Sequence, residues 1–132
     1  MKSRNATYLE RLKKERGYLL ETHEFLAAND PSFLEAYNGL FEYIMTKEKI
    51  LPIKIKELIV IALLCSRGQY EAVRLHVKRA MDHAATPREI LEAMETAMVY
   101  SGAPSLIYGA DSLIKHLTEI GKIDVRSKRI LP

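Results

Sequence analysis

The chain has 132 residues, of which 20 are Lys or Arg and 17 are Asp or Glu, for a formal net charge of +3. This length predicts a single domain, residues 1–132, with one hydrophobic core. The positive charge is slight and scattered, whereas a nucleic-acid-binding surface would show clustered Lys and Arg with aromatic residues between them. We therefore expect no nucleic-acid partner.

The sequence also predicts a cytoplasmic protein with no membrane-spanning segment. Its one cysteine, Cys65, cannot form an internal disulfide, and residues 1–20 carry charge throughout, where a signal peptide needs an apolar stretch. The aliphatic run 50–64 is interrupted by charged side chains. It is therefore far from the roughly 18 consecutive apolar residues that a membrane span requires.

Apolar residues at helical spacing predict an all-α protein of about six helices, and no alternating pattern is long enough to indicate a sheet. The first predicted helix runs from about residue 6 to residue 28. Asp30 is then a suitable N-cap, with Pro31 at the first helical position. The second helix begins there and fades near residue 47, so the N-terminal helices occupy residues 1–50.

The third predicted helix begins at Pro52 and ends near Ser66. Its sequence is apolar on nearly every side, which is typical of a central helix. Gly68 then provides a break, and helical spacing resumes in a fourth helix from Tyr70 to Ala84.

A capping box begins the fifth predicted helix, because Thr86 is followed by Pro87 and, three residues on, by Glu89. Gly102 and Pro104 end that helix and begin the last one, which runs to about residue 120. Residues 51–121 thus form the helical core that follows the N-terminal helices. The remaining residues, 122–132, have no clear periodicity, so we expect either an arm on a neighbouring subunit or a disordered tail.

Glu57 and His76 are the strongest candidates for functional residues. They lie 19 positions apart on the third and fourth predicted helices, and a helix–turn–helix can bring two such residues into one cleft. A carboxylate beside an imidazole forms an acid–base site, because histidine exchanges protons near neutral pH. Two simpler interpretations stay open, namely a solvent-facing Glu57 and a core histidine at position 76.

The spacing around this pair matches a known pattern. From Glu57 it passes eleven residues to Gln69, two more to Ala72 and three more to His76. The stretch 51–108 also contains KELIVIA, RLH, an Ala-Thr-Pro-x-Glu-Ile helix start and a Tyr-x-Gly-x-Pro break. Together these features resemble the carboxymuconolactone decarboxylase superfamily, whose other branch is the alkylhydroperoxidase-D-like proteins.

In the alkylhydroperoxidase branch the resemblance implies Glu-x11-Cys-x2-Cys-x3-His, in which two cysteines perform disulfide chemistry and the Glu and His relay protons. Gln69 and Ala72 stand at the two cysteine positions here, so peroxidase chemistry of the CxxC type is not supported. We interpret the remaining thiol, Cys65, as a buried structural residue. A thiol-dependent peroxidase that uses Cys65 is accordingly the least favoured function.

The decarboxylase branch lacks the cysteine pair, and its Gly-x-x-Glu-x-x-x-x-His segment resembles residues 68–76. This resemblance implies a lyase that removes CO2 from a small carboxylated lactone without a metal or organic cofactor. His76 and Glu57 would be the acid–base pair. The expected contacts to the anionic substrate are Arg74, Arg67, Gln69 and Tyr100. A non-catalytic or ligand-sensing helical oligomer on the same scaffold is the alternative, so catalytic activity itself stays open.

We expect no metal site, because zinc pairs on one helix are usually four residues apart, whereas His76 and His83 are seven apart. The resemblance also implies a homo-oligomer, either a trimer or a hexamer. The wide apolar stripes of the first and third predicted helices agree with this, since they exceed what one small bundle can bury. The site would then lie at a subunit interface.

Overall fold

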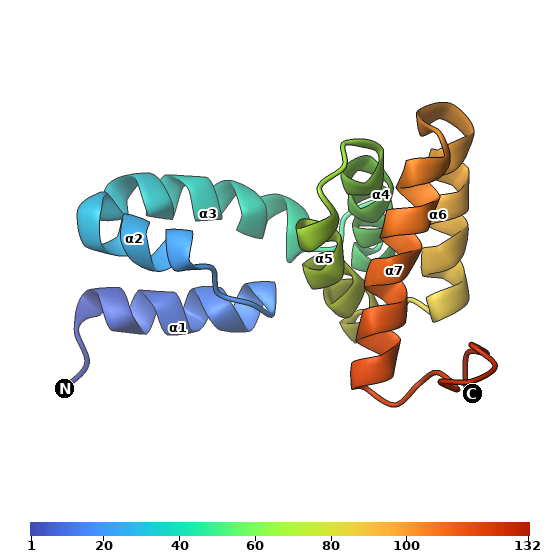
Figure 1. Cartoon of the computed structure of the whole chain (residues 1–132). Helices are drawn as coiled ribbons and strands as arrows, with labels where there is room; N and C mark the ends of the chain where they lie inside the picture. Colours follow the sequence, from blue (N-terminus) through green and yellow to red (C-terminus); the bar gives the residue numbers. More distant parts are fainter. The chain divides into compact units, whose positions relative to one another are not determined.

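The computed structural model describes residues 1–132 and is built of helices (Figure 1). This confirms the all-α fold class, with seven helices where the sequence predicts about six. The chain forms two compact units, Met1–Ile50 and Leu51–Pro132. The first unit holds helices α1 (Arg4–Arg16), α2 (Glu21–Asn29) and α3 (Pro31–Met45); the second holds α4 (Ile53–Ser66), α5 (Tyr70–Asp82), α6 (Pro87–Ser101) and α7 (Ala103–Glu119). None of these helices is long and apolar enough to cross a membrane.

The additional helix arises because the prediction of one helix over residues 6–28 is wrong. Gly17 adopts a left-handed conformation with φ of 82°, and its N–H donates to Lys13 O, so α1 ends there. The chain then runs extended to Leu20, whose N–H donates to His23 Nδ1 over 3.1 Å at the start of α2. Apolar spacing continues across this break because α1 and α2 cover the same small core, so periodicity alone does not reveal it.

The N-terminal unit combines an apolar core with a buried cation. Leu12, Ala27 and Leu34 form the core. Arg16 is buried, donates from Nε to Asn38 Oδ1 over 2.8 Å and stacks over aromatic rings at the start of the segment after α1 and on α3. Aromatic faces and an amide oxygen thus surround this guanidinium and compensate part of its desolvation.

In the C-terminal unit, α4 packs against α5 and α6, and α7 packs against α5 and α6. The four helices run side by side (Figure 1). The core between them contains Ile61, Val73, Val77, Ala80, Ile90, Met94, Leu113 and Leu117.

Helix α4 is less central than its sequence predicts. Its buried residues recur every four positions, Ile53, Glu57, Ile61 and Cys65, so a single face is turned inward. Leu63, on the opposite side, is 57% exposed. An all-apolar helix is therefore not sufficient evidence for burial on all sides, and the one charged residue of its inner face is Glu57.

The predicted start of α6 is confirmed in detail. Thr86 Oγ1 accepts from the Glu89 N–H over 3.1 Å, and Glu89 Oε2 accepts from the Thr86 N–H over 2.9 Å. Lys54 Nζ lies 3.1 Å from Glu89 Oε1 and links α4 to α6. The Thr86 N–H, followed by Lys54, lowers the pKa of the Glu89 carboxyl.

The residues after α7 fold back onto their own unit. Gly121 has φ of 67° and reverses the chain. A bridge then joins Ile123 to Ile130, and the Leu131 N–H donates to Lys122 O over 2.9 Å. Ile123 is buried in the core and Ile130 packs against it, so two apolar residues hold the tail in place.

Helices α4 and α7 approach closely at Gly109. A Cβ atom at this position would lie 2.7 Å from Cys65 Sγ and 3.5 Å from Met94 Sδ. Both neighbours are fully buried. The space beside Gly109 is thus occupied by the buried side chains of Cys65 and Met94.

We predict that Gly109→Ala lowers the free energy of unfolding by about 1–3 kcal/mol through overpacking. Combining it with Cys65→Ala should cost less than the sum of the two single changes, because the smaller side chain removes the clash. Gly39→Ala is the control: a Cβ there meets nothing within 4 Å, so it should leave stability unchanged or raise it by up to about 1 kcal/mol. Urea unfolding measures all four variants, and additive costs would contradict the prediction.

Candidate functional site

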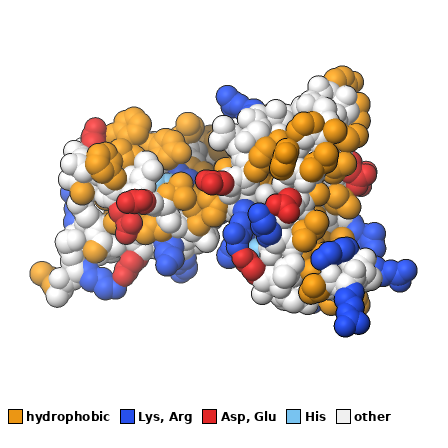
Figure 2. Space-filling model, in the orientation of Figure 1, with side chains coloured by type: hydrophobic (Ala, Val, Ile, Leu, Met, Phe, Trp, Pro, Cys, Tyr) orange, Lys and Arg blue, Asp and Glu red, His pale blue; other side chains and the backbone are white.

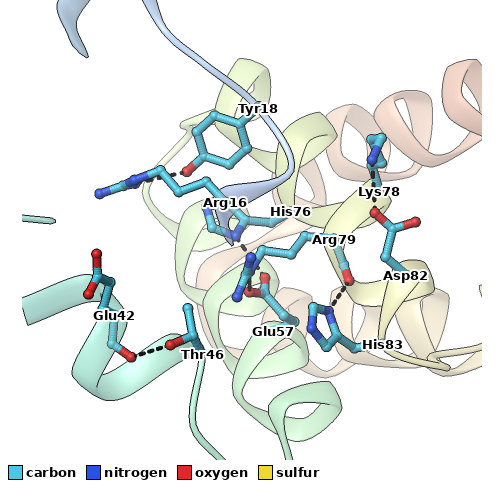
Figure 3. Close-up of polar contacts among 10 residues, drawn as sticks. All are labelled: Arg16, Tyr18, Glu42, Thr46, Glu57, His76, Lys78, Arg79, Asp82 and His83. Carbon is cyan, nitrogen blue, oxygen red and sulfur yellow. Dashed lines mark hydrogen bonds and ion pairs between the residues drawn. The ribbon is translucent and has the colours of Figure 1, made fainter. Parts of the chain in front are cut away.

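Glu57 and His76 lie in contact. Glu57 Oε2 is 2.7 Å from His76 Nδ1, a hydrogen bond between the inner face of α4 and the facing side of α5 (Figure 3). The turn between the helices reverses the chain, helped by Gly68 with φ of 72°. Glu57 lies nine residues before the end of α4, and His76 lies six residues after the start of α5. The two residues are therefore at similar levels along the paired helices, which explains how positions 19 apart in sequence meet.

A third residue, Arg79, completes the cluster. Arg79 Nε donates to Glu57 Oε1 over 2.5 Å, so the two carboxylate oxygens bind two different side chains of α5 (Figure 3). Sequence reasoning missed Arg79. The available signal was its position three residues after His76, which puts both on one side of the helix. A buried carboxylate on the apolar face of α4 also requires a cationic partner.

Burial differs among the three side chains in a way that suits a reactive site. Glu57 is fully buried and Arg79 is 3% exposed, whereas the His76 side chain is 13% exposed. Buried charges persist in proteins when they are paired and hydrogen-bonded, as the carboxylate and guanidinium are here. The imidazole is thus the member of the cluster that reaches the surface, and the buried ion pair of Glu57 and Arg79 lies behind it.

The backbone of Arg79 is held by the end of α5. His83 Nδ1 lies 2.9 Å from Arg79 O and donates to it (Figure 3). Lys78 and Asp82 form an exposed ion pair of 2.8 Å on the outer side of the same turn. The structure contains no group of three or more His, Cys, Asp or Glu side chains arranged to hold a metal ion.

Arg74, predicted to bind the substrate, is not beside the pair. It lies two residues before His76 and so projects to the other side of α5. There it forms an ion pair with Glu119 of α7 and lines a cavity of about 290 Å³ together with Lys115 and Tyr108. The lining of this cavity includes negatively as well as positively charged side chains, since Glu71 and Asp111 also contribute to it.

The other three predicted contacts lie near helix ends. Arg67 and Gln69 are exposed in the turn between α4 and α5, and Gln69 lines a cavity of about 320 Å³ at the start of α5. Seven helical residues, roughly 10 Å along the axis at 1.5 Å per residue, separate Gln69 from His76. Tyr100 is 95% exposed near the end of α6.

Cys65 lies on the same face of α4 as Glu57, two turns further along. The residue is fully buried, with Sγ packed toward Gly109. Burial raises the pKa of its thiol to about 11. A thiolate is therefore disfavoured near neutral pH, which agrees with the interpretation of Cys65 as a structural residue.

Two proteins of similar sequence have no assigned function. An uncharacterised protein of Methanocaldococcus jannaschii is 28% identical over 95 residues, which are 72% of this chain and 88% of that protein. Another, from Cupriavidus necator, is 28% identical over 88 residues, 67% of this chain and 77% of that protein. Neither relative's name states a reaction.

A solved structure and a family model give the classification. The crystal structure of a Burkholderia xenovorans protein that is named for carboxymuconolactone decarboxylase superposes with a TM-score of 0.73 at 20% identity, covering 88% of this chain and 92% of that one. This likeness shows a shared fold. The model of the carboxymuconolactone decarboxylase family matches residues 31–113, more than half of the chain. The chain therefore belongs to the carboxymuconolactone decarboxylase family.

Proposed function

We propose that the protein is a cofactor-independent decarboxylase, or a related lyase, that acts on a small carboxylated lactone or a similar anionic acid. The observation that carries this proposal is the 2.7 Å contact between Glu57 Oε2 and His76 Nδ1, with the imidazole at the surface end of the cluster. The reaction class comes from membership of the family. The arrangement of the side chains supports acid–base catalysis by His76.

Decarboxylation requires little more than a proton carrier and a place for charge. When the carboxylate is on a ring carbon that is next to or conjugated with the lactone carbonyl, the bond between that carbon and the carboxylate carbon breaks, CO2 leaves, and the bonding electrons pass into the carbonyl as an enolate. His76, after taking up a proton from solvent at Nε2, returns it to the carbon of the enolate. Glu57 orients the ring and stabilises the imidazolium while it carries the extra proton.

A non-catalytic ligand sensor on the same scaffold predicts that Glu57 and His76 are far apart or occluded. Instead they are in hydrogen-bond contact and the imidazole is partly exposed, which favours the enzyme. A thiol-dependent peroxidase fits less well, because its thiol would be buried and protonated near neutral pH. The substrate roles of Arg74, Arg67, Gln69 and Tyr100 stay predictions.

We further propose that the protein acts as a homo-oligomer, a trimer or a hexamer. Helix α3 supports this, because it exposes an apolar stripe at helical spacing (Phe33, Tyr37, Leu40 and Ile44). Hydrophobic side chains also gather elsewhere on the surface of both units (Figure 2). Contiguous exposed apolar side chains of this kind are typical of protein interfaces.

Replacing His76 with Ala should reduce turnover of γ-lactone carboxylates by about 10²–10⁴-fold, the range expected when a general acid–base is removed. Glu57→Gln should reduce it as well, since the ring loses its carboxylate partner. The matched control is Glu92→Gln, the same change at an exposed position of α6. Steady-state kinetics over a panel of these lactones measures the effect, and unchanged turnover in both site variants would eliminate the assignment.

Cys65 should resist alkylation in the folded protein and react once the chain is unfolded in urea. Its folded pKa of about 11 lies above the usual value of 9.0, so the thiol stays protonated in the folded state while the unfolded thiol ionises. The contribution of the Cys65 thiol to the free energy of unfolding is fully present below the unfolded pKa of 9.0 and is lost as the pH rises through about 11. Iodoacetamide labelling followed by mass spectrometry checks it; rapid labelling of the native protein at neutral pH would reverse this conclusion.

Leu40→Lys should dissociate the oligomer, because it places a charge in the middle of the apolar stripe. Gly39→Lys introduces the same charge at the neighbouring position, which is off the stripe and has open space around it. Size-exclusion chromatography with light scattering compares the two variants. We expect a smaller species for Leu40→Lys alone, and an unchanged assembly in that variant would remove α3 from the proposed interface.

A further inference from the structure

We infer that Arg79 is a positioning residue of this site, which fixes the Glu57 carboxylate so that His76 carries its ring proton on Nδ1 and presents the lone pair on Nε2. The inference rests on the proposed acid–base role of Glu57 and His76. It adds a third residue to that pair and specifies which nitrogen of the imidazole carries the ring proton.

The assignment of the proton follows from the donors and acceptors. A guanidinium can only donate hydrogen bonds, so Glu57 Oε1 accepts from Arg79 Nε over 2.5 Å. The other oxygen, Oε2, lies 2.7 Å from His76 Nδ1 and, as a carboxylate oxygen, accepts there too. Nδ1 must then be the protonated nitrogen. In a neutral imidazole this leaves the lone pair on Nε2.

The carboxylate is unable to satisfy these partners in another orientation at low cost. Glu57 is fully buried, so a rotated carboxylate would leave a guanidinium or an oxygen without its hydrogen bond in an apolar environment. Arg79 itself is fixed at both ends: its side chain is buried against Glu57, and its carbonyl accepts from His83 Nδ1 over 2.9 Å. The orientation of the His76 ring thus depends on a chain of contacts that begins in the last turn of α5.

Charge balance gives Arg79 a second effect on the same group. A buried carboxylate requires positive charge nearby, and Arg79 supplies it permanently. Glu57 can therefore serve as an acceptor for a neutral imidazole as well as for an imidazolium. This suits a proton carrier, which alternates between the two forms during one turnover.

The nitrogen-15 spectrum of the imidazoles tests the inference on the full-length protein at mildly alkaline pH. His76 should show the Nδ1–H tautomer, assigned by the loss of its signals in His76→Gln. Two other histidines provide internal references. His23 Nδ1 accepts from the Leu20 N–H, so His23 must show Nε2–H, whereas His83 donates from Nδ1 to Arg79 O. Burial, followed by Arg16, lowers the pKa of His23 and keeps that reference neutral.

Variants of Arg79 provide the second arm of the test. Arg79→Met should lose the preference of His76 for Nδ1–H and reduce kcat by about 10–100-fold, as for the outer partners that orient metal-bound histidines, with KM nearly unchanged. Arg79→Lys keeps the charge without the planar fork and should recover part of kcat. Arg88→Met, at an exposed position on α6, is the control and should match the unmodified protein in both measurements.

Two results would overturn the inference. One is an unmodified protein in which His76 carries its proton on Nε2 or on both nitrogens. The other is an Arg79→Met protein with the original tautomer and the original kcat. If Arg79→Met fails to fold, the nitrogen-15 spectrum of the unmodified protein, together with the spectrum and kcat of Arg79→Lys, tests the inference. Unchanged turnover in both His76→Ala and Glu57→Gln would refute the proposed function instead, and the spectra would still report whether Arg79 sets the tautomer.

Discussion

One fully buried carboxylate, that of Glu57, determines how the site is built. It occupies the inner face of α4, where the other buried residues are apolar, and burial without partners would cost several kcal/mol. Helix α5 supplies both partners, an imidazole and a guanidinium, from positions three residues apart. The register of α4 against α5 therefore depends on the same contacts that orient His76, so the fold and the chemistry share one constraint.

Much of the fold could be predicted because its signals are local. Thr86 and Glu89 determine the start of α6 by two reciprocal hydrogen bonds, with Pro87 at the first helical position, and the structure has both bonds as expected. The break at Gly17 could not be predicted from apolar spacing, because two short helices on one core repeat the same periodicity as one long helix. The exposure of Leu63 was also missed, since hydrophobicity does not say which faces find a neighbour.

The candidate site was predictable in part for the same reason. The spacing of Glu57 and His76 led to the pair, and the structure joins them. Arg79 was missed, because an arginine on a helix is expected to face solvent unless a buried carboxylate is known to lie beside it. Arg74 shows the converse. Its charge suggested an anion site, but its position two residues from His76 turns it toward α7 and Glu119. Position around the helix separates the two arginines: Arg79, three residues after His76, lies on the same side of α5, and Arg74, two residues before it, lies on the other side.

The central claim is that a small anionic acid reacts at the exposed edge of His76. A crystal structure of the assembled protein with an unreactive γ-lactone carboxylate tests this most directly. The account predicts that the ligand lies with a ring carbon facing His76 Nε2, while Glu57 and Arg79 keep their contacts beneath it. A ligand bound instead in the cavity of Arg74 and Lys115, with His76 untouched, would contradict it.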